Sequence, residues 1–426
     1  MLWTQIVVYI TVYFGLFTSV FFLLILLDRR KEINDPGIKK FPFVSIIINV
    51  WNEEKVIHNV IKSVLDLNYP KDKYEIIVVD DGSTDRTYER AKVFCNKGLP
   101  FVRVLKKKNG GAASAKNYGI KYARGEIVTT LDADSFVCRD ALKKMLGYFD
   151  DNDIYAVTAA LTVHDPKGFW QNVQLIEYTL GIFLRKVFSL ADAIHVIPGP
   201  FSLYRKKLFD KIGYFEENNI TEDTEIAMRT QSYGYKIKNC MSANVYTIAP
   251  DNFKALMKQR IRWYYGFMYN SFKYRNLFNP IERRDNLAVL LLPAAFVSVF
   301  LTIASLFVFF YQNYVYFKDS IARVMVLGYN IIPQVSDISS VNLNYVKDVI
   351  VSYVINPFTL FIILGLFTTL FFVFLAKKLS QDKRSYVFAL FCFFLTYWFF
   401  YALWWISAFT YRIVLRKKIK WGPRYY

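Results

Sequence analysis

Two aspartates separated by one alanine, Asp132 and Asp134, follow a β-branched run that begins at Glu126. Alternate residues of an extended chain project to the same side, so both carboxylates can face one point. Paired carboxylates hold Mg²⁺ or Mn²⁺, and such a cation bridges diphosphate oxygens and stabilises a leaving group. Isolated Asp-x-Asp pairs also occur on ordinary surfaces, so the preceding strand and the neighbouring motifs decide in favour of chemistry.

An acidic pair upstream, Asp80 and Asp81, is followed by Gly82 and Ser83. The glycine permits a tight turn and the serine can cap a helix, so a plain strand-turn-helix connection would explain the pattern. A carboxylate at this position can also accept hydrogen bonds from a base N–H or a ribose hydroxyl.

A second acidic pair follows Thr221, at Glu222 and Asp223. Threonine is a good helix cap and acids suit a first helical turn, so a structural role is one interpretation. A rigidly held carboxylate can also serve as a general base for a hydroxyl nucleophile. The two roles are compatible.

A basic and aromatic group, Gln259-Arg260-Ile261-Arg262-Trp263, lies on a predicted helix from Asn252 to Asn270. Arg262 can stabilise a departing diphosphate, and an exposed Trp263 can stack on a sugar ring. An aromatic and basic belt at a membrane surface is the structural alternative.

Two glycine-containing segments complete the candidate site. Gly110 and Gly111 enter a helix, where backbone N–H groups can approach phosphate. Gly199 lies between two prolines, which fix a rigid turn.

The predicted elements explain how these groups could meet. Strands are expected at 44–48, 75–79 and 126–131, with helices at 54–67, 85–96 and 112–123. Short apolar strands alternating with helices predict a mainly parallel sheet covered on both faces. Ligands of such sheets bind beyond the carboxyl ends of the strands, where the acidic pairs fall.

The motif order resembles the membrane-integrated family 2 glycosyltransferases, which include cellulose, chitin and hyaluronan synthases. Their DDGS, DxD, TED and QxxRW motifs match residues 43–263 in order. The resemblance implies a GT-A α/β domain with an α-helical transmembrane region. The Gly110-Gly111 segment, where many processive members have Gly-Lys, departs from the pattern towards non-processive relatives.

The resemblance also implies residue roles. Asp223 would be the catalytic base, and a Mg²⁺ or Mn²⁺ ion would be held by Asp132 and Asp134. The implied donor-binding residues are Glu53, Asp81, Asp132 and Arg262. The implied acceptor-binding residues are Glu222, Trp263, Gln259 and Gly199. The implied reaction is inverting transfer from a nucleotide-diphospho-sugar, a UDP-sugar above others, to a growing β-linked polysaccharide or oligosaccharide. The alternative is non-processive transfer to a lipid such as polyprenyl phosphate, and an inactive transporter or scaffold is a third class.

Four uncharged apolar segments bound the hydrophilic block: 1–27, 286–317, 349–376 and 385–411. Each is long enough to cross a bilayer as a helix. We therefore expect a transmembrane helix at 1–27, a GT-A domain at 28–285 and a C-terminal membrane region at 286–426 with about three helices.

The net charge of +19 comes from 54 basic and 35 acidic residues, and basic residues gather at the ends of the apolar segments. No nucleic-acid motif accompanies this charge, so lipid headgroups and a nucleoside diphosphate are the expected partners. The Arg29-Arg30-Lys31 cluster places 28–285 in the cytoplasm of a multi-pass membrane protein. Four spans would then place the basic tail after Tyr411 outside. This conflicts with the tendency of basic residues to lie on the cytoplasmic side of a membrane.

The four cysteines include no C-x-x-C pair, which suits a reducing compartment without a disulfide framework. The three histidines have no metal-ligand spacing.

Overall fold

The computed structural model describes residues 2–95, 102–283, 285–327, 357–416, 420–421 and 424–425. The chain forms two compact units. One comprises Met1–Leu23 and Ala294–Phe372, and the other comprises Leu24–Pro293 and Val373–Tyr426. The candidate site residues all lie in the second unit, which also contains the last apolar helix.

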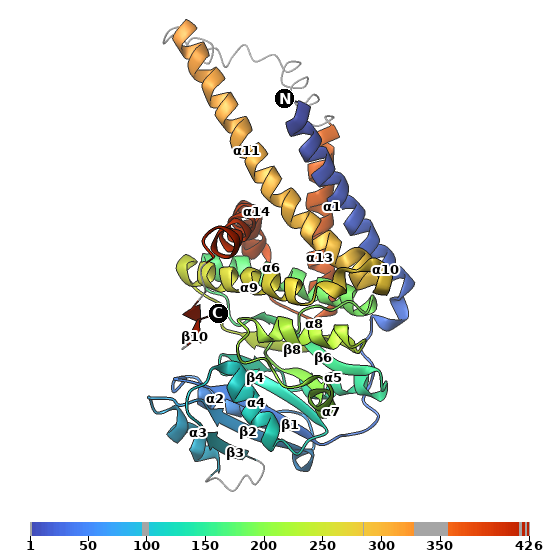
Figure 1. The fold of residues 1–426 in the computed structure, drawn as a ribbon, viewed down its shortest axis with the longest axis vertical. Coiled ribbons are helices and arrows are strands. Elements are labelled where there is room, and N and C mark those ends of the chain that lie inside the picture. The colour runs from blue at the N-terminus through green and yellow to red at the C-terminus, as the bar shows by residue number, and fades with distance from the viewer. Residues whose placement is uncertain are drawn as a thin grey trace. The chain divides into compact units, whose positions relative to one another are not determined.

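The second unit is built on an eight-stranded sheet with the order β3-β2-β1-β4-β7-β6-β8-β5 (Figure 1). The first four strands in this order are parallel, whereas β7 runs antiparallel to β4 and β6, and β5 runs antiparallel to β8. The sheet is therefore mixed: β6 and β8 also pair in parallel, and the antiparallel pairings that the sequence did not predict all involve β7 or β5. The strands are β1 (Val44–Val50), β2 (Tyr74–Asp80), β3 (Val102–Lys106), β4 (Ile127–Asp132), β5 (Ser135–Val137), β6 (Ile154–Val163), β7 (Ser202–Arg205) and β8 (Lys236–Thr247).

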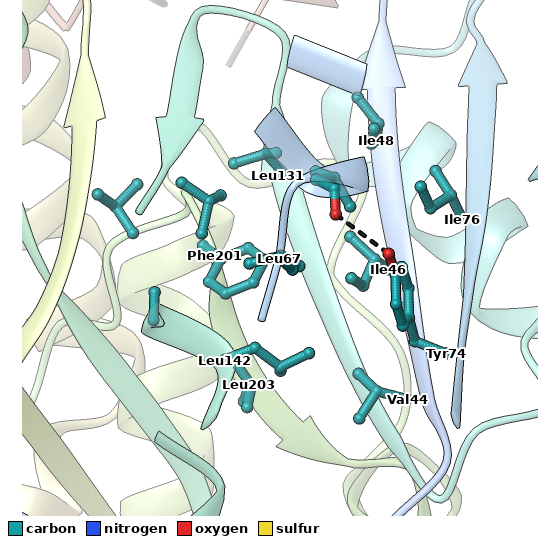
Figure 2. Packing of buried hydrophobic residues seen from close by; sticks show 14 of the residues in the cluster. Val44, Ile46, Ile48, Leu67, Tyr74, Ile76, Leu131, Leu142, Phe201 and Leu203 are labelled. Atoms are coloured by element: carbon teal, nitrogen blue, oxygen red, sulfur yellow. Dashed lines mark hydrogen bonds between the residues drawn. The ribbon is translucent and has the colours of Figure 1, made fainter. Parts of the chain in front are cut away.

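Both faces of the sheet are buried, because the central strands carry apolar side chains on both sides. In β1, Ile46 and Ile48 belong to one core cluster, whereas Ile47 belongs to the cluster on the opposite face. Figure 2 shows the first cluster, where Phe201 and Leu131 pack beside the β1 residues. A strand buried on both faces has an almost continuous apolar sequence, which is why β1 and β2 were recognisable.

The register of the parallel strands brings the predicted motifs together. Asn49 on β1 pairs with Asp132 on β4, and Val50 pairs with Asp80 on β2. The carboxyl ends of β1, β2 and β4 therefore meet at one edge of the sheet. The acidic motifs at the ends of β2 and β4 lie at this edge, as the sequence predicted.

The helices of the second unit cover the sheet and one of its ends. Helix α4 lies very close to β1, because a Cβ on Gly119 would be 2.4 Å from a methyl carbon of Ile47. The helices are α2 (Ile57–Leu65), α3 (Thr87–Cys95), α4 (Ala112–Tyr122), α5 (Ala141–Leu146), α6 (Phe169–Leu190), α7 (Lys206–Ile212), α8 (Glu222–Ser232), α9 (Phe253–Lys273), α10 (Pro280–Arg283) and α14 (Val387–Phe409).

Three helices, Trp3–Asp28, Leu287–Ala322 and Val387–Val414, are long and apolar enough to cross a membrane. The first two contain most of α1 (Leu2–Asp28) and of α11 (Leu292–Leu327), and the third begins with α14. The expected span at 349–376 begins outside the described residues, and its remainder lies in α13 (Pro357–Leu379). Most of the basic tail after residue 416 also lies outside them, so its side of the membrane stays a prediction.

Helices α8 and α9 approach each other at a glycine. A Cβ on Gly266 would lie 2.2 Å from the Thr221 Oγ1 atom, which is far inside van der Waals contact. One turn later, the Asn270 side chain donates to Thr221 Oγ1 over 3.1 Å and accepts from Asn219 over 2.8 Å. These contacts fix the start of α8 against α9.

Replacing Gly266 with alanine should destabilise this junction. Because the added methyl group must displace Thr221, we expect a loss of about 1–3 kcal/mol in the free energy of unfolding. Gly15→Ala in α1 is a matched control, since nothing lies within 4 Å of a Cβ there. Thermal unfolding of both variants in detergent measures the difference. Equal midpoints for the two variants would contradict this close packing.

Candidate active site

The Asp132 and Asp134 pair lies where β4 turns into β5. Asp132 accepts a hydrogen bond from Asn49 Nδ2 over 3.2 Å, and Asp134 accepts one from Ser135 Oγ over 2.9 Å. Asp134 is solvent-exposed. The surrounding protein nevertheless reduces the hydration of its carboxylate, and Asp132 repels it, so that its pKa is raised to about 6. A divalent cation at this pair would relieve the repulsion.

These carboxylates suit a hard cation in their chemistry and position. Mg²⁺ and Mn²⁺ prefer oxygen ligands, and Mg²⁺ commonly takes one or two carboxylates together with substrate phosphates. Among the described residues, no group of three Asp, Glu, His or Cys side chains could hold a metal. The pair therefore suits a metal that shares its coordination with a bound diphosphate and water.

The predicted donor residues Glu53 and Asp81 follow the neighbouring strands β1 and β2. Burial and the nearby charges of Asp134 and Asp85 raise the pKa of Glu53. Asp81 accepts hydrogen bonds from Lys107 over 2.6 Å and from the Gly111 N–H over 2.7 Å. Asp81 thus holds the glycine loop at the start of α4, and the loop lies at the site edge as predicted.

A residue that the sequence interpretation missed, Lys116 on α4, connects the two acidic motifs. Its Nζ atom lies 3.0 Å from Glu222 and 3.6 Å from Asp132. Although burial lowers its pKa, Asp132 and Glu222 raise it above the ordinary value, so the side chain is charged. The small residues Ala113, Ala115 and Gly119 were the available signal, since they bring α4 so close to the sheet that this lysine is buried.

Glu222 and Asp223 occupy the first turn of α8. Burial alone would raise the pKa of Glu222, but Lys116 and Arg262 together lower it. Burial and the neighbouring Glu222 charge raise the pKa of Asp223 to about 6, against the opposing effect of Arg262. A carboxylate with this pKa is ionised at neutral pH and can still accept a proton effectively.

The expected capping role of Thr221 is wrong in detail. Thr221 stands at the N-cap position of α8, but its side chain makes no capping hydrogen bond. Its hydroxyl instead contacts Asn270 on α9. The threonine therefore joins two helices, and the position of Asp223 depends on α9.

Helix α9 begins after Asn252, whose side chain caps it, and it carries the predicted Gln259, Arg262 and Trp263. Arg262 Nη1 donates over 3.2 Å to the carbonyl of Ile220, two residues before Glu222. Gln259 does not point to the acids, because its Oε1 atom accepts from Arg260 over 2.6 Å. Trp263 is partly exposed, and its ring centroid lies 6.4 Å from that of Tyr178 on α6.

The turn at Pro198–Phe201 closes the site beside Asp132. A Cβ on Gly199 would lie 3.0 Å from Asp132 Oδ2 and 3.4 Å from Lys116 Nζ. Phe201, at the end of this turn, is fully buried and has a φ of 56°, in the left-handed region. Such a backbone costs about 1–3 kcal/mol in a non-glycine residue and persists where the surroundings enforce it. The turn is therefore held in one conformation beside Asp132. The absence of a side chain at Gly199 leaves space next to Asp132 and Lys116.

Ion pairs and electrostatic interactions between distant segments thus form one charged cluster. Its members are Asp132, Lys116, Glu222, Asp223 and Arg262. Asp134, Glu53 and Gly199 border it, Asp81 lies at the glycine loop, and Trp263 lies on α9 next to Arg262. Gln259 is engaged away from the cluster by Arg260, and the Asp81 carboxylate is engaged by Lys107 and the glycine loop. This arrangement can bind a diphosphate, hold a cation and remove a proton from a hydroxyl group.

Comparison with known proteins agrees with this arrangement. Residues 45–213 match the family model described as glycosyl transferase family 2. The chain is 35% identical over 225 residues to a poly-beta-1,6-N-acetyl-D-glucosamine synthase of Staphylococcus epidermidis, covering 52% of this chain and 54% of that protein. It is 32% identical over 243 residues to the synthase of the same name from Staphylococcus aureus (strain COL), covering 56% and 57%. The chain thus spans about half the length of the curated relatives it matches.

A solved structure shows the same fold. A mannosyltransferase from Pyrobaculum calidifontis, in complex with GDP-Man and Mn²⁺, superimposes with a TM-score of 0.59 at 16% sequence identity. The alignment covers 90% of this chain and 99% of that chain. The expected GT-A fold class is confirmed.

Lys116→Met should destabilise the protein most at neutral and alkaline pH. Removal of a buried cation leaves its carboxylate partners uncompensated, at a cost of about 3–5 kcal/mol. The pKa of Glu222, which Lys116 lowers in the folded protein, then rises above its wild-type value, so stability is retained at low pH and lost as pH rises through that pKa. We therefore expect a larger fall in the unfolding midpoint at pH 8 than at pH 5.

Lys186→Met is the matched control, because Lys186 is equally buried but forms an ion pair with one carboxylate, Asp35, and also donates to the Tyr148 hydroxyl. For this variant, the fall in the unfolding midpoint should differ less between pH 8 and pH 5 than for Lys116→Met. If Lys116→Met lost the same stability at both pH values, Lys116 would not control the ionisation of the acidic motifs.

Proposed function

Because the chain contains a glycosyl transferase family 2 domain, we propose that it transfers N-acetylglucosamine from UDP-N-acetylglucosamine to a growing β-linked polysaccharide at a membrane. The observation that carries this proposal is the joining of Asp132 and Glu222 by Lys116, which sets a donor motif beside an acceptor motif. The named activity of the staphylococcal relatives supports the choice of sugar and polymer.

The donor would bind at the carboxyl ends of β1, β2 and β4. Glu53 and Asp81 are proposed to bind the nucleoside, and Asp132 and Asp134 to hold Mg²⁺ or Mn²⁺. That cation would neutralise the charge that develops on the diphosphate as it departs from the sugar. Arg262 is a fixed cation near the same acids and would contribute further electrostatic stabilisation.

The acceptor would approach from the side of α8 and α9. Asp223 removes the proton of the acceptor hydroxyl, whose oxygen forms a bond to the anomeric carbon while the bond to the diphosphate breaks. Attack opposite the leaving group inverts the configuration. Glu222 and Gly199 are proposed to border the acceptor, with Trp263 stacking on its terminal sugar, and Gln259 acts indirectly through Arg260.

The three helices of the described residues that are long and apolar enough to cross a membrane support attachment to a bilayer. We propose a multi-pass protein with 1–27 as its first span, 28–285 as a cytoplasmic catalytic domain and 286–426 as the remaining membrane region. The donor would then come from the cytoplasmic nucleotide-sugar pool.

Asp223→Asn should abolish transfer and preserve donor binding. The amide keeps the size of the side chain but cannot accept the proton, so we expect kcat to fall by about 10²–10⁴-fold. Wild-type activity should decline as pH falls through about 6, because protonation of Asp223 removes the base. The measurement is the pH-rate profile together with nucleotide binding by both proteins. A near-normal rate in the variant would assign the base to another residue.

The donor and the product can be identified in one experiment. Purified full-length protein in lipid is incubated with radiolabelled UDP-N-acetylglucosamine, UDP-glucose or GDP-mannose, and product length is measured. We expect polymer from the first donor, loss of product with a chelator, and shorter product from Trp263→Ala. The Asp223→Asn protein is the background control. Single-sugar lipid products from wild type with every donor would overturn the polymer assignment.

A further inference from the structure

Helix α9 has two faces that contact different parts of the second unit. Arg262, Gly266 and Asn270, each four residues apart, face the Thr221 segment that begins α8. The opposite face carries Arg260 and Tyr264, which contact aromatic residues of α14. Trp263 lies between these faces, beside Arg262 in sequence and one turn after Arg260.

Arg260 is fully buried, with 0% of its side chain exposed. Its Nη2 atom lies 2.5 Å from Oε2 of Glu177 on α6. The guanidinium carbon lies 4.1 Å from the ring centroid of Trp263 and 5.6 Å from that of Trp404 on α14. The arginine therefore contacts one indole on its own helix and another on α14, while its charge is balanced by α6.

Glu177 connects the same three helices through its second oxygen. Its Oε1 atom accepts from the Tyr397 hydroxyl on α14 over 3.3 Å. Nearby, the Tyr264 and Trp405 rings stack with centroids 4.4 Å apart. The α6-α9-α14 junction thus contains this buried ion pair within an aromatic layer.

Stability alone does not account for this pair. Desolvation of both charges offsets most of their attraction, and well-packed apolar residues often serve equally well in its place. A buried pair does restrict the geometry, because neither charge can leave its partner without a large penalty. The planar guanidinium can also stack on an indole, which lysine cannot do.

We propose that Arg260 and Glu177 are positioning residues that hold the Trp263 indole at the acceptor side of the site and link its position to α14. This inference rests on the proposed function, in which Trp263 contacts the acceptor sugar. The pair lies on the opposite face of α9 from Arg262, so it should act on acceptor binding and product length rather than on the donor.

The test uses full-length protein in lipid with Glu177→Gln and Arg260→Lys. The first keeps the shape of Glu177 and removes its charge, and the second keeps the positive charge and removes the planar stacking group. With UDP-N-acetylglucosamine and a short β-linked N-acetylglucosamine oligosaccharide, we expect the acceptor KM to rise by about 10- to 100-fold. Product length should fall, while the donor KM and donor hydrolysis without acceptor stay within about twofold.

Asp35→Asn is the matched control, because the Lys186–Asp35 pair lies at the other end of α6. The exposed fractions of its side chains are 1% and 11%, against 0% and 15% for Arg260 and Glu177. This variant should lose comparable stability and keep the wild-type acceptor KM. Thermal unfolding of all variants shows that each is folded at the assay temperature.

A double-mutant cycle distinguishes positioning of the indole from a general loss of packing in the variant proteins. If Glu177 acts through the indole, the effects of Glu177→Gln and Trp263→Phe on the acceptor KM combine to less than their product. Independent effects, an unchanged acceptor KM, or an equal change in Asp35→Asn would each overturn the positioning role. Absence of any sugar transfer by wild type would instead overturn the proposed function, so the two failures are distinguishable.

Discussion

The charge balance around Lys116 is the constraint on which the site depends. Asp132 comes from the end of β4, whereas Glu222 and Asp223 are neighbours at the start of α8, and like charges gathered in a partly buried space repel one another. The lysine compensates this repulsion because it pairs with Asp132 and Glu222 at once. Its own burial follows from the close approach of α4 to β1 at Gly119. Sheet packing therefore determines which acids remain ionised.

Helix α9 imposes the second constraint, because it contacts both the acidic motif and the apolar helix α14. On one face, Gly266 and Asn270 fix Thr221 and hence the helix that carries Asp223. On the other face, Arg260 forms its ion pair with Glu177 beside Trp404. Both the Asp223 carboxylate and the indole next to Arg262 are thus positioned by one element, α9. A sugar acceptor placed against Trp263 would be oriented relative to Asp223 without movement of either group.

The edge of the sheet at the carboxyl ends of β1, β2 and β4 is held in place for a different reason. Parallel pairing of β1 with β2 and β4 aligns the strand ends, and Asn49 contacts Asp132 directly. The turn that carries Gly199 is held in place by the buried, left-handed Phe201. Strain of this kind is retained near functional sites because the surrounding contacts enforce one conformation. The carboxylates at the end of β4 are accordingly presented by backbone that has little freedom.

The sequence by itself determined the local features: apolar runs for β1, β2 and β4, the acidic pairs at strand ends, the α9 helix and the apolar segments. These follow from short-range periodicity, and parallel strands must end at a common edge. Tertiary structure alone decided the mixed half of the sheet, the partners of Lys116 and the pairing of Arg260 with Glu177. The small residues of α4 indicate close packing but do not identify the partners of Lys116, and an ion pair between residues 83 positions apart has no periodicity. Only packing brings such charges together, because only in the folded chain are they removed from water and forced to find partners.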